Sequence, residues 1–222
     1  MRFPLIFAMK KYFIFFVMSI ICLDLWSQGS LKTQSKFGFK LGSGMQTITG
    51  SFVKTIPRIA FMAGMWVQLK INKSWTMQAE LTKIGKGTGL GLHQPSFGDY
   101  WLNIAYFEFP ILFQYNKQNA YFEFGPSLGT FINFGEYTNG GVLPYRADLY
   151  PFSKKDISFN LGTGYLFNEK WQVGLRMTHS LLPVRKQLPT TSHPGYNKGI
   201  ILAVSRQINL QATRTKQLQV IE

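Results

Sequence analysis

Residues 102–129, LNIAYFEFPILFQYNKQNAYFEFGPSLG, decide the fold that this sequence can adopt. Side chains of a β-strand point alternately to its two faces, so residues two apart share a face. In the first half, Phe107, Phe109, Ile111, Phe113 and Tyr115 alternate with Tyr106, Glu108, Pro110, Leu112 and Gln114. In the second half, Phe122, Phe124, Pro126 and Leu128 alternate with Glu123, Gly125, Ser127 and Gly129. We therefore predict two long strands joined by the polar turn 116–119, with one apolar face and one polar face.

The same alternation recurs on both sides of this hairpin. Further strands are predicted at about 36–46, 56–70, 75–82, 157–165, 171–178 and 199–208. The long loops 47–55, 85–99, 135–156 and 181–197 alternate with the short turns 71–74, 116–119 and 168–170. Short periplasmic turns opposite longer outer loops are typical of bacterial outer-membrane barrels. Closure is required because an open sheet edge in lipid leaves backbone groups unpaired, at several kcal/mol each.

The sequence therefore predicts an all-β fold, an eight-stranded antiparallel transmembrane β-barrel with short periplasmic turns and long outer loops. The barrel is expected over residues 36–210, after a periplasmic lead-in at 28–35 and before a periplasmic tail at 211–222.

Residues 1–27 have the pattern of a secretory signal peptide that is cleaved on export. Arg2, Lys10 and Lys11 precede the apolar run 12–25. This run is shorter than the ~18 to 20 residues of a membrane-spanning helix. An uncleaved N-terminal anchor is the alternative. Cys22, the only cysteine of the chain, lies in the run, so the exported protein is expected to form no disulfides. The predicted location is the outer membrane.

The net charge of +14 indicates an anionic neighbour. The basic residues are spread along the chain and do not cluster on a helix or alternate with stacking aromatic residues, so nucleic acid is not an expected partner. Spread positive charge fits anionic lipid head groups better. The expected partners are outer-membrane lipid and lipopolysaccharide, with envelope proteins as further candidates, and a monomer is expected.

Aromatic residues gather where a membrane interface is expected. Trp75, Tyr115, Tyr121 and Trp171 flank the short turns, and Tyr100 and Trp101 mark the opposite rim. Tryptophan and tyrosine are enriched at both membrane interfaces, so these residues are predicted to form an interfacial aromatic belt.

Charged residues are predicted inside the barrel. Strand alternation places six of them in the lumen: Lys40, Arg58, Glu80, Glu108, Glu123 and Arg176. A narrow interior offers little water to solvate carboxylates, so we predict a buried network of ion pairs. Independent, hydrated lumen charges are the alternative. Glu80 and Arg176 are expected at similar depth, on strands that lie across the barrel from each other.

No catalytic, cofactor or metal site is predicted. His179 and Ser180 are consecutive in a strand, so they point to opposite faces and cannot share a proton. The alternating Gly85, Gly87, Gly89 and Gly91 precede no helix and do not fit a phosphate-binding loop. His93, His179 and His193 lie on separate elements without the spacing of metal ligands.

Several motifs resemble one known family. FGFKLG, MQAELTKIGKG, the YFEFPILFQY and YFEFGPSLG pair, and FNLGTGYLFNEKWQVGLRM are similar to the PorT-like outer-membrane β-barrel family of Bacteroidota. The similarity covers about 37–208, and the EFP and EFGP hairpin is its most specific part. The resemblance implies a barrel in the outer membrane. The family takes its name from a member involved in protein secretion.

An eight-stranded barrel is just wide enough for its own side chains, so an open pore is not expected. The leading hypothesis is a non-enzymatic outer-membrane protein that is structural, binds at the surface, or is accessory to envelope or secretion machinery. A membrane-embedded lipid-modifying enzyme is one alternative. A soluble, lipocalin-like carrier is the other, and it would turn Phe107, Phe109 and Phe113 inward while exposing Glu108 and Glu123.

Overall fold

The computed structural model describes residues 35–49, 55–90, 100–138, 141–143, 152–185 and 194–208. The predicted signal peptide and tail lie outside these residues, as does nearly all of the lead-in. The strands are β1 (Ser35–Ile48), β2 (Thr55–Lys70), β3 (Trp75–Leu90), β4 (Tyr100–Lys117), β5 (Ala120–Thr138), β6 (Gly141–Leu143), β7 (Lys155–Leu166), β8 (Trp171–Ser180) and β9 (Asn197–Ile208). Within the described residues, no helix is long and apolar enough to cross a membrane.

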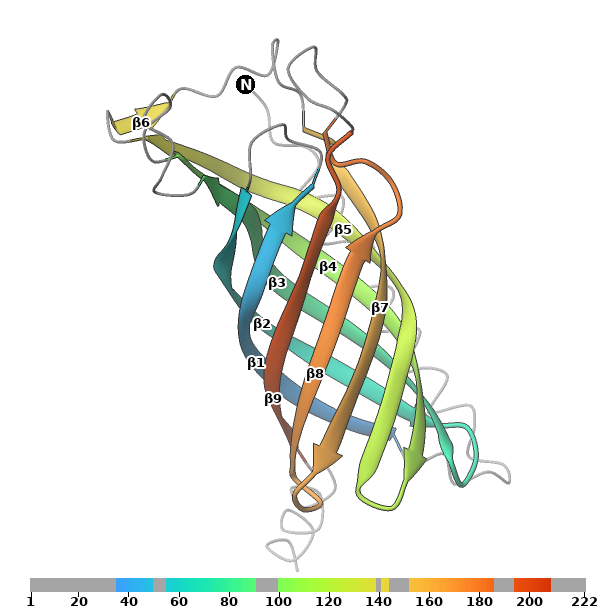
Figure 1. Cartoon of the computed structure of the whole chain (residues 1–222). Helices are drawn as coiled ribbons and strands as arrows, with labels where there is room; N and C mark the ends of the chain where they lie inside the picture. The colour runs from blue at the N-terminus through green and yellow to red at the C-terminus, as the bar shows by residue number, and fades with distance from the viewer. Residues whose placement is uncertain are drawn as a thin grey trace, which may run out of the picture. The chain divides into compact units, whose positions relative to one another are not determined.

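The strands form one closed antiparallel sheet (Figure 1). The order runs β4-β3-β2-β1-β9-β8-β7-β5, and pairing of β4 with β5 completes the circle. The first and last strands meet from Phe37 opposite Ile208 to Ile48 opposite Asn197. β6 pairs only with the end of β5 and adds no strand to the circle. The predicted eight-stranded antiparallel barrel is confirmed.

The apolar face of the strands points outward. Phe61 and Leu41 are among the most exposed side chains, at 73% and 66%, whereas Gln78 and Glu80 are buried. Phe107 and Phe113 are exposed and Glu108 and Glu123 are buried, as the alternation predicts. The outward face is therefore apolar and the inward face polar, which is the reverse of a soluble carrier with an apolar cavity.

The barrel has two different ends. The connections 71–74, 118–119 and 167–170 are short, and we call this the turn end. In the hairpin between β4 and β5 the turn itself is only Gln118-Asn119, shorter than predicted, and Gln118 has a φ of 54°. Asn72 and Asn168 stabilise the other two turns, because each side chain accepts hydrogen bonds from backbone amides two and three residues ahead.

The strands extend further toward the other end, the loop end, than the sequence predicted. β3 continues to Leu90, although 85–99 was predicted as a glycine-rich loop. Gly87 has a φ of 145°, and a Cβ there would collide with the carbonyl of Leu102 on β4. Glycine at this position therefore permits a close approach of two strands. β5 likewise continues to Thr138, inside the predicted loop 135–156.

A substitution at Phe109 tests whether the outward face contacts lipid. Phe109 lies near the middle of β4, opposite Leu128 of β5. Phe109→Arg is expected to lower the free energy of unfolding by about 2 to 4 kcal/mol, because it places a charge near the bilayer midplane. Urea unfolding in lipid vesicles measures this loss. Tyr115→Arg, beside Trp75 at the turn end, is the control and should cost only about 0 to 1 kcal/mol. Equal, small losses in both variants would contradict the assigned membrane position.

Candidate functional site

Four charged side chains meet inside the barrel and form what we call the central network: Lys40, Glu80, Glu123 and Arg176. Arg176 binds Glu80 through two parallel hydrogen bonds, from Nη1 to Oε2 and from Nη2 to Oε1, each 2.8 Å. Its Nε also donates to Glu123 Oε1 at 2.7 Å. Lys40 forms an ion pair with Glu80. All four side chains are buried, so the two cations neutralise the two carboxylates out of contact with solvent.

Neutral amides complete the hydrogen bonds of this network. Gln78 donates to Glu80 Oε1 at 2.6 Å, and Gln114 donates to Glu123 Oε2 at 3.0 Å. Gln68 in turn donates to Gln114 Oε1 at 2.5 Å. A buried charge is tolerated only when it is paired and its remaining lone pairs are satisfied. These amides supply that second condition for Glu80 and Glu123.

Glycines on β7 and β8 make room for the large lumen side chains. A Cβ at Gly162 would lie 2.8 Å from Glu123 Oε1. A Cβ at Gly164 would collide with the ring of Tyr121, and a Cβ at Gly174 would collide with its hydroxyl oxygen. Tyr121 is buried in the lumen, so its predicted place in the interfacial belt is wrong. Its position follows from strand alternation, since Tyr121 and Glu123 share a face.

A second group of charges lies nearer the loop end, and we call it the loop-end cluster: Lys86, Glu108, Asp156, Ser180 and Asn197. Lys86 forms ion pairs with Glu108 and with Asp156, the latter at 2.8 Å. Asp156 also accepts hydrogen bonds from Ser180 Oγ at 2.7 Å and from Asn197 Nδ2 at 2.9 Å. All five residues are buried. The interior charges are therefore divided between two groups, where the sequence predicted one network.

Two of the six predicted lumen charges are not in the central network. Glu108 belongs to the loop-end cluster because Lys86, which lies in the predicted loop 85–99, reaches it from β3. Arg58 forms no ion pair with a described residue, and its Nη1 donates to the carbonyl of Leu102 at 3.3 Å. Lys86 and Asp156 were missed, although Glu80 and Lys86 share a face by simple alternation.

An apolar plug packs inside the lumen around the loop-end cluster. Its buried members are Ile48, Ala60, Met62, Ile84, Leu102, Ile104, Tyr106, Val184, Ile201 and Ala203. Val184 comes from the segment after β8 and is fully buried. The backbone of Val184 bonds to Ser153 and Gly195, each at 2.8 Å, so two loop segments are tied together over the plug. Charges and apolar side chains together occupy the interior.

His179 and Ser180 point to opposite faces of β8. Ser180 donates to Asp156 inside the barrel, whereas His179 Nδ1 lies 2.7 Å from the carbonyl oxygen of Ser180 and its ring faces Tyr196 at 6.3 Å. The histidine cannot accept the serine proton in this arrangement. His93, His193 and Gly91 lie outside the described residues. The described residues contain no group of three or more potential metal-binding His, Cys, Asp or Glu side chains.

Aromatic residues surround the turn end. The rings of Trp75 and Tyr115 are 5.3 Å apart, and the guanidinium of Arg206 lies 5.3 Å from the ring of Trp171. Tyr115 and Trp171 are exposed and Trp75 is partly exposed, as an interfacial position requires. Tyr100 and Trp101 begin β4 at the loop end, but their side chains lie outside the described part of the structure.

A family model described as an outer membrane protein beta-barrel domain matches residues 26–185. The chain belongs to this family. The match and the confirmed barrel support a location in the outer membrane. A comparison with curated proteins found no match.

Three solved outer-membrane barrels are similar to this chain at low sequence identity. Neisserial surface protein A is 11% identical, with 79% of this chain and 99% of that chain covered and a TM-score of 0.51. Ail of Yersinia pestis is 10% identical, with 79% and 99% covered and a TM-score of 0.47. OprG from Pseudomonas aeruginosa is 11% identical, with 79% and 94% covered and a TM-score of 0.41. At such low identity, the likeness to Neisserial surface protein A shows the fold alone.

The central network is expected to behave as one unit in unfolding. Arg176→Ala should cost about 3 to 5 kcal/mol, because it leaves two buried carboxylates without their main partner. The double variant Glu80→Gln/Arg176→Ala should lose less than the sum of the single losses, because either change alone already breaks the shared interaction. Urea unfolding of the barrel in detergent measures all three losses.

The control pair combines Arg176→Ala with Asp156→Asn. Asp156 lies six residues along β7 from Gly162, the residue that pairs with Arg176, which is about 20 Å of strand. The two side chains share no partner, so their losses should add within about 0.5 kcal/mol. Additive losses in the Glu80 and Arg176 pair as well would show that the charges act independently.

Proposed function

We propose that this protein is a non-enzymatic, non-conducting outer-membrane barrel that acts through its loops and its outer wall. The filled lumen is the observation that carries the proposal. The central network spans the interior, with Arg176 of β8 bound to Glu80 of β3. The apolar plug and Val184 occupy the loop end. A lumen occupied in this way is expected to leave no continuous aqueous path, because its charged groups bind one another and apolar side chains pack around the loop-end cluster.

The interior also argues against a lipid-modifying enzyme. The Ser180 hydroxyl donates a hydrogen bond to Asp156, a carboxylate that is already paired with Lys86. A serine nucleophile needs a base that can take its proton and a site that substrate can reach. Ser180 is buried, and His179 points away from it. The described residues thus support a structural role for this polar cluster.

The resemblance to PorT-like barrels of Bacteroidota supports a more specific role. The motifs that carry it lie on the strands and turns of the barrel, above all on the hairpin of β4 and β5. We infer that the protein is exported with a cleaved signal peptide, that its turn end faces the periplasm, and that it is an accessory component of envelope or secretion machinery. Protein partners would then bind at the loops or the turns, because the lumen is filled.

Reconstitution into planar lipid bilayers tests the non-conducting barrel. We expect no stable single-channel steps in about 1 M salt. At this concentration the Debye length is about 3 Å, so charges in the lumen cannot repel ions from a distance. A general porin inserted by the same protocol is the positive control. Reproducible conductance steps from the wild-type barrel would contradict the proposal.

Crosslinking in native membranes tests the accessory role. A tagged chain should be recovered with one or a few envelope proteins, at a fixed ratio and after detergent extraction. Crosslink positions should lie in the loops or turns, because these are the parts of the barrel outside the lipid. A matched barrel of the same family, expressed at the same level, controls for chance neighbours. Recovery of the same proteins with both barrels would contradict a specific partner.

A further inference from the structure

β2 and β3 separate in the part of the barrel toward the loop end. They pair from Thr55 to Pro57 and again from Met62 to Lys70, with a shift of register between Pro57 and Met62. Residues 58–61 of β2 have no paired residue on β3, and residues 85–87 of β3 have no paired residue on β2. Unpaired backbone at membrane depth is tolerated where it lines a cavity, because lipid offers no hydrogen bonds. The separation therefore requires a cavity or an occupant.

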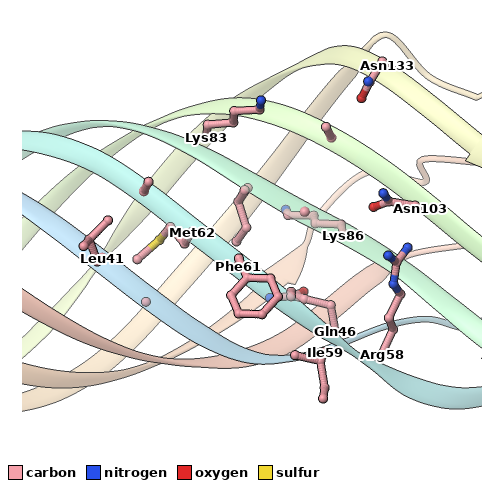
Figure 2. A pocket seen from close by; sticks show the side chains of 16 residues that line it. Leu41, Gln46, Arg58, Ile59, Phe61, Met62, Lys83, Lys86, Asn103 and Asn133 are labelled. Atoms are coloured by element: carbon pink, nitrogen blue, oxygen red, sulfur yellow. The ribbon is translucent and has the colours of Figure 1, made fainter.

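A cavity of about 610 Å³ lies at this separation (Figure 2). Its lining includes side chains from both faces of the barrel wall: Ile59, Phe61 and Lys83 from the outward face, and Gln46, Ala60 and Met62 from the inward face. Because it has both kinds of lining, the cavity extends through the sheet from the lipid side toward the lumen. Its volume is in the range of small-molecule binding sites, about 300 to 1,000 Å³.

Gln46 gives the cavity an unsatisfied polar group. It is 1% exposed, and neither its Nε2 nor its Oε1 has a hydrogen-bond partner in the described structure. Leaving a buried amide unpaired costs about 1 to 3 kcal/mol per group. An ester carbonyl or hydroxyl entering the cavity would supply the missing partner. Gln46 therefore indicates an occupant whose polar atoms lie close to the apolar groups that contact the rest of the cavity.

The cations of the cavity indicate the charge of that occupant. Arg58 and Lys83 both line it, and neither forms an ion pair with a described residue. Asn103 and Asn133 add amide groups to the same lining. Arg58 follows Pro57, the partner of Thr88, and Asn103 pairs with Gly87, so Arg58 and Asn103 lie at the same level. Lys83 pairs with Ala63, about 16 Å of strand from Arg58. A phosphate group therefore matches the guanidinium of Arg58 beside the amide of Asn103 and does not reach Lys83. The apolar residues Phe61 and Met62 match a hydrocarbon chain instead.

The depth of the cavity fits a lipid head group. Met62 pairs with Ile84, nine residues beyond Trp75 on β3, and Arg58 follows Pro57, the partner of Thr88, which is 13 residues beyond Trp75. At about 3.3 Å per residue and a strand tilt of about 40°, these levels are roughly 23 Å and 33 Å along the membrane normal from the aromatic belt. The apolar band of such barrels is about 25 Å tall, so Met62 lies within the band and Arg58 lies just beyond its far edge. Phosphate groups of the leaflet at the loop end are at this level.

We propose that the opening between β2 and β3 binds a phosphorylated acyl lipid of the surrounding membrane. The phosphate lies against Arg58, the polar link between head group and chain reaches Gln46, and part of an acyl chain packs against Phe61 and Met62. The barrel would in this way hold one lipid partly inside its wall, in addition to the lipid that surrounds it.

Photocrosslinking of the full chain tests this site. The protein is placed in nanodiscs of phosphatidylcholine that contain phosphatidylglycerol with a photoactivatable acyl chain, and adducts are mapped by mass spectrometry. We expect adducts on the inward-facing Gln46, Ala60 and Met62, which lipid outside the wall cannot reach. Adducts confined to outward-facing residues such as Phe61 and Leu41 would overturn the proposal.

A variant that fills the cavity provides the matched control. A Cβ at Gly85 would meet only Asn103 Oδ1 at 3.8 Å and Phe61 O at 4.0 Å, so a larger side chain enters open space. Gly85→Leu should lower inward labelling by about tenfold and leave outward labelling unchanged, whereas Gly85→Ala should retain both. Ala105→Leu, which fills the same cavity from β4, is the second filling variant if Gly85→Leu does not fold. Unchanged inward labelling in a folded, filled barrel would overturn the proposal.

The head group is tested separately. The same photoactivatable chain on diacylglycerol, which has no phosphate, should label the inward residues about tenfold less than on phosphatidylglycerol. Arg58→Gln should abolish this preference, whereas Lys83→Gln, the matched control, should retain it. Equal labelling with both lipids in the wild-type protein would overturn the role of the phosphate. Retention of a faster mobility in SDS before boiling shows that each variant is folded.

Discussion

Backbone hydrogen bonding in lipid is the constraint on which this structure depends. Each strand must offer its N–H and C=O groups to a neighbour on both sides, because the hydrocarbon region offers no other partner. The circle of pairings, completed between β1 and β9 and between β4 and β5, meets that requirement almost everywhere. It also fixes which residues face each other across a narrow interior. The break between β2 and β3 departs from the rule, and it coincides with the cavity.

The packing of the interior depends on the size of the side chains as much as on their charge. Arg176 reaches Glu80 across the lumen because the barrel is narrow, and Tyr121 fits only because Gly164 and Gly174 lack side chains. Trp66 is similarly placed against Gly38, with its Nε1 donating to the carbonyl of Phe39 at 3.3 Å. Large and small residues thus alternate across facing strands, which is the packing expected of a filled eight-stranded barrel. The charges of the central network neutralise each other within that packing, and in the loop-end cluster Glu108 and Asp156 share Lys86.

Strand alternation is a local property of the sequence, so the two faces, the eight strands and the short turns could be predicted from it. The part of β3 beyond residue 84 could not be predicted, because Gly85, Gly87 and Gly89 are typical of a loop. The Leu102 carbonyl that requires glycine at position 87 lies on another strand, β4. That error removed Lys86 from the set of lumen charges. Arg58 was assigned to the inward face, but the register break between β2 and β3 leaves it beside the cavity. The ion-pair partners across the lumen depend on how the sheet closes, and this cannot be predicted from a local sequence pattern.

The seam between β1 and β9 joins the two ends of the barrel sequence. Contacts between residues so distant in sequence carry a large entropic cost before they contribute any stabilisation, and chains dominated by such contacts fold slowly. Until the seam forms, β1 and β9 each keep one unpaired edge, and Arg176 on β8 cannot yet be held opposite Glu80. Closure is therefore a late and cooperative event, in which the edges disappear and the buried charges are matched together. During biogenesis this makes the unclosed sheet the species most in need of protection by a chaperone.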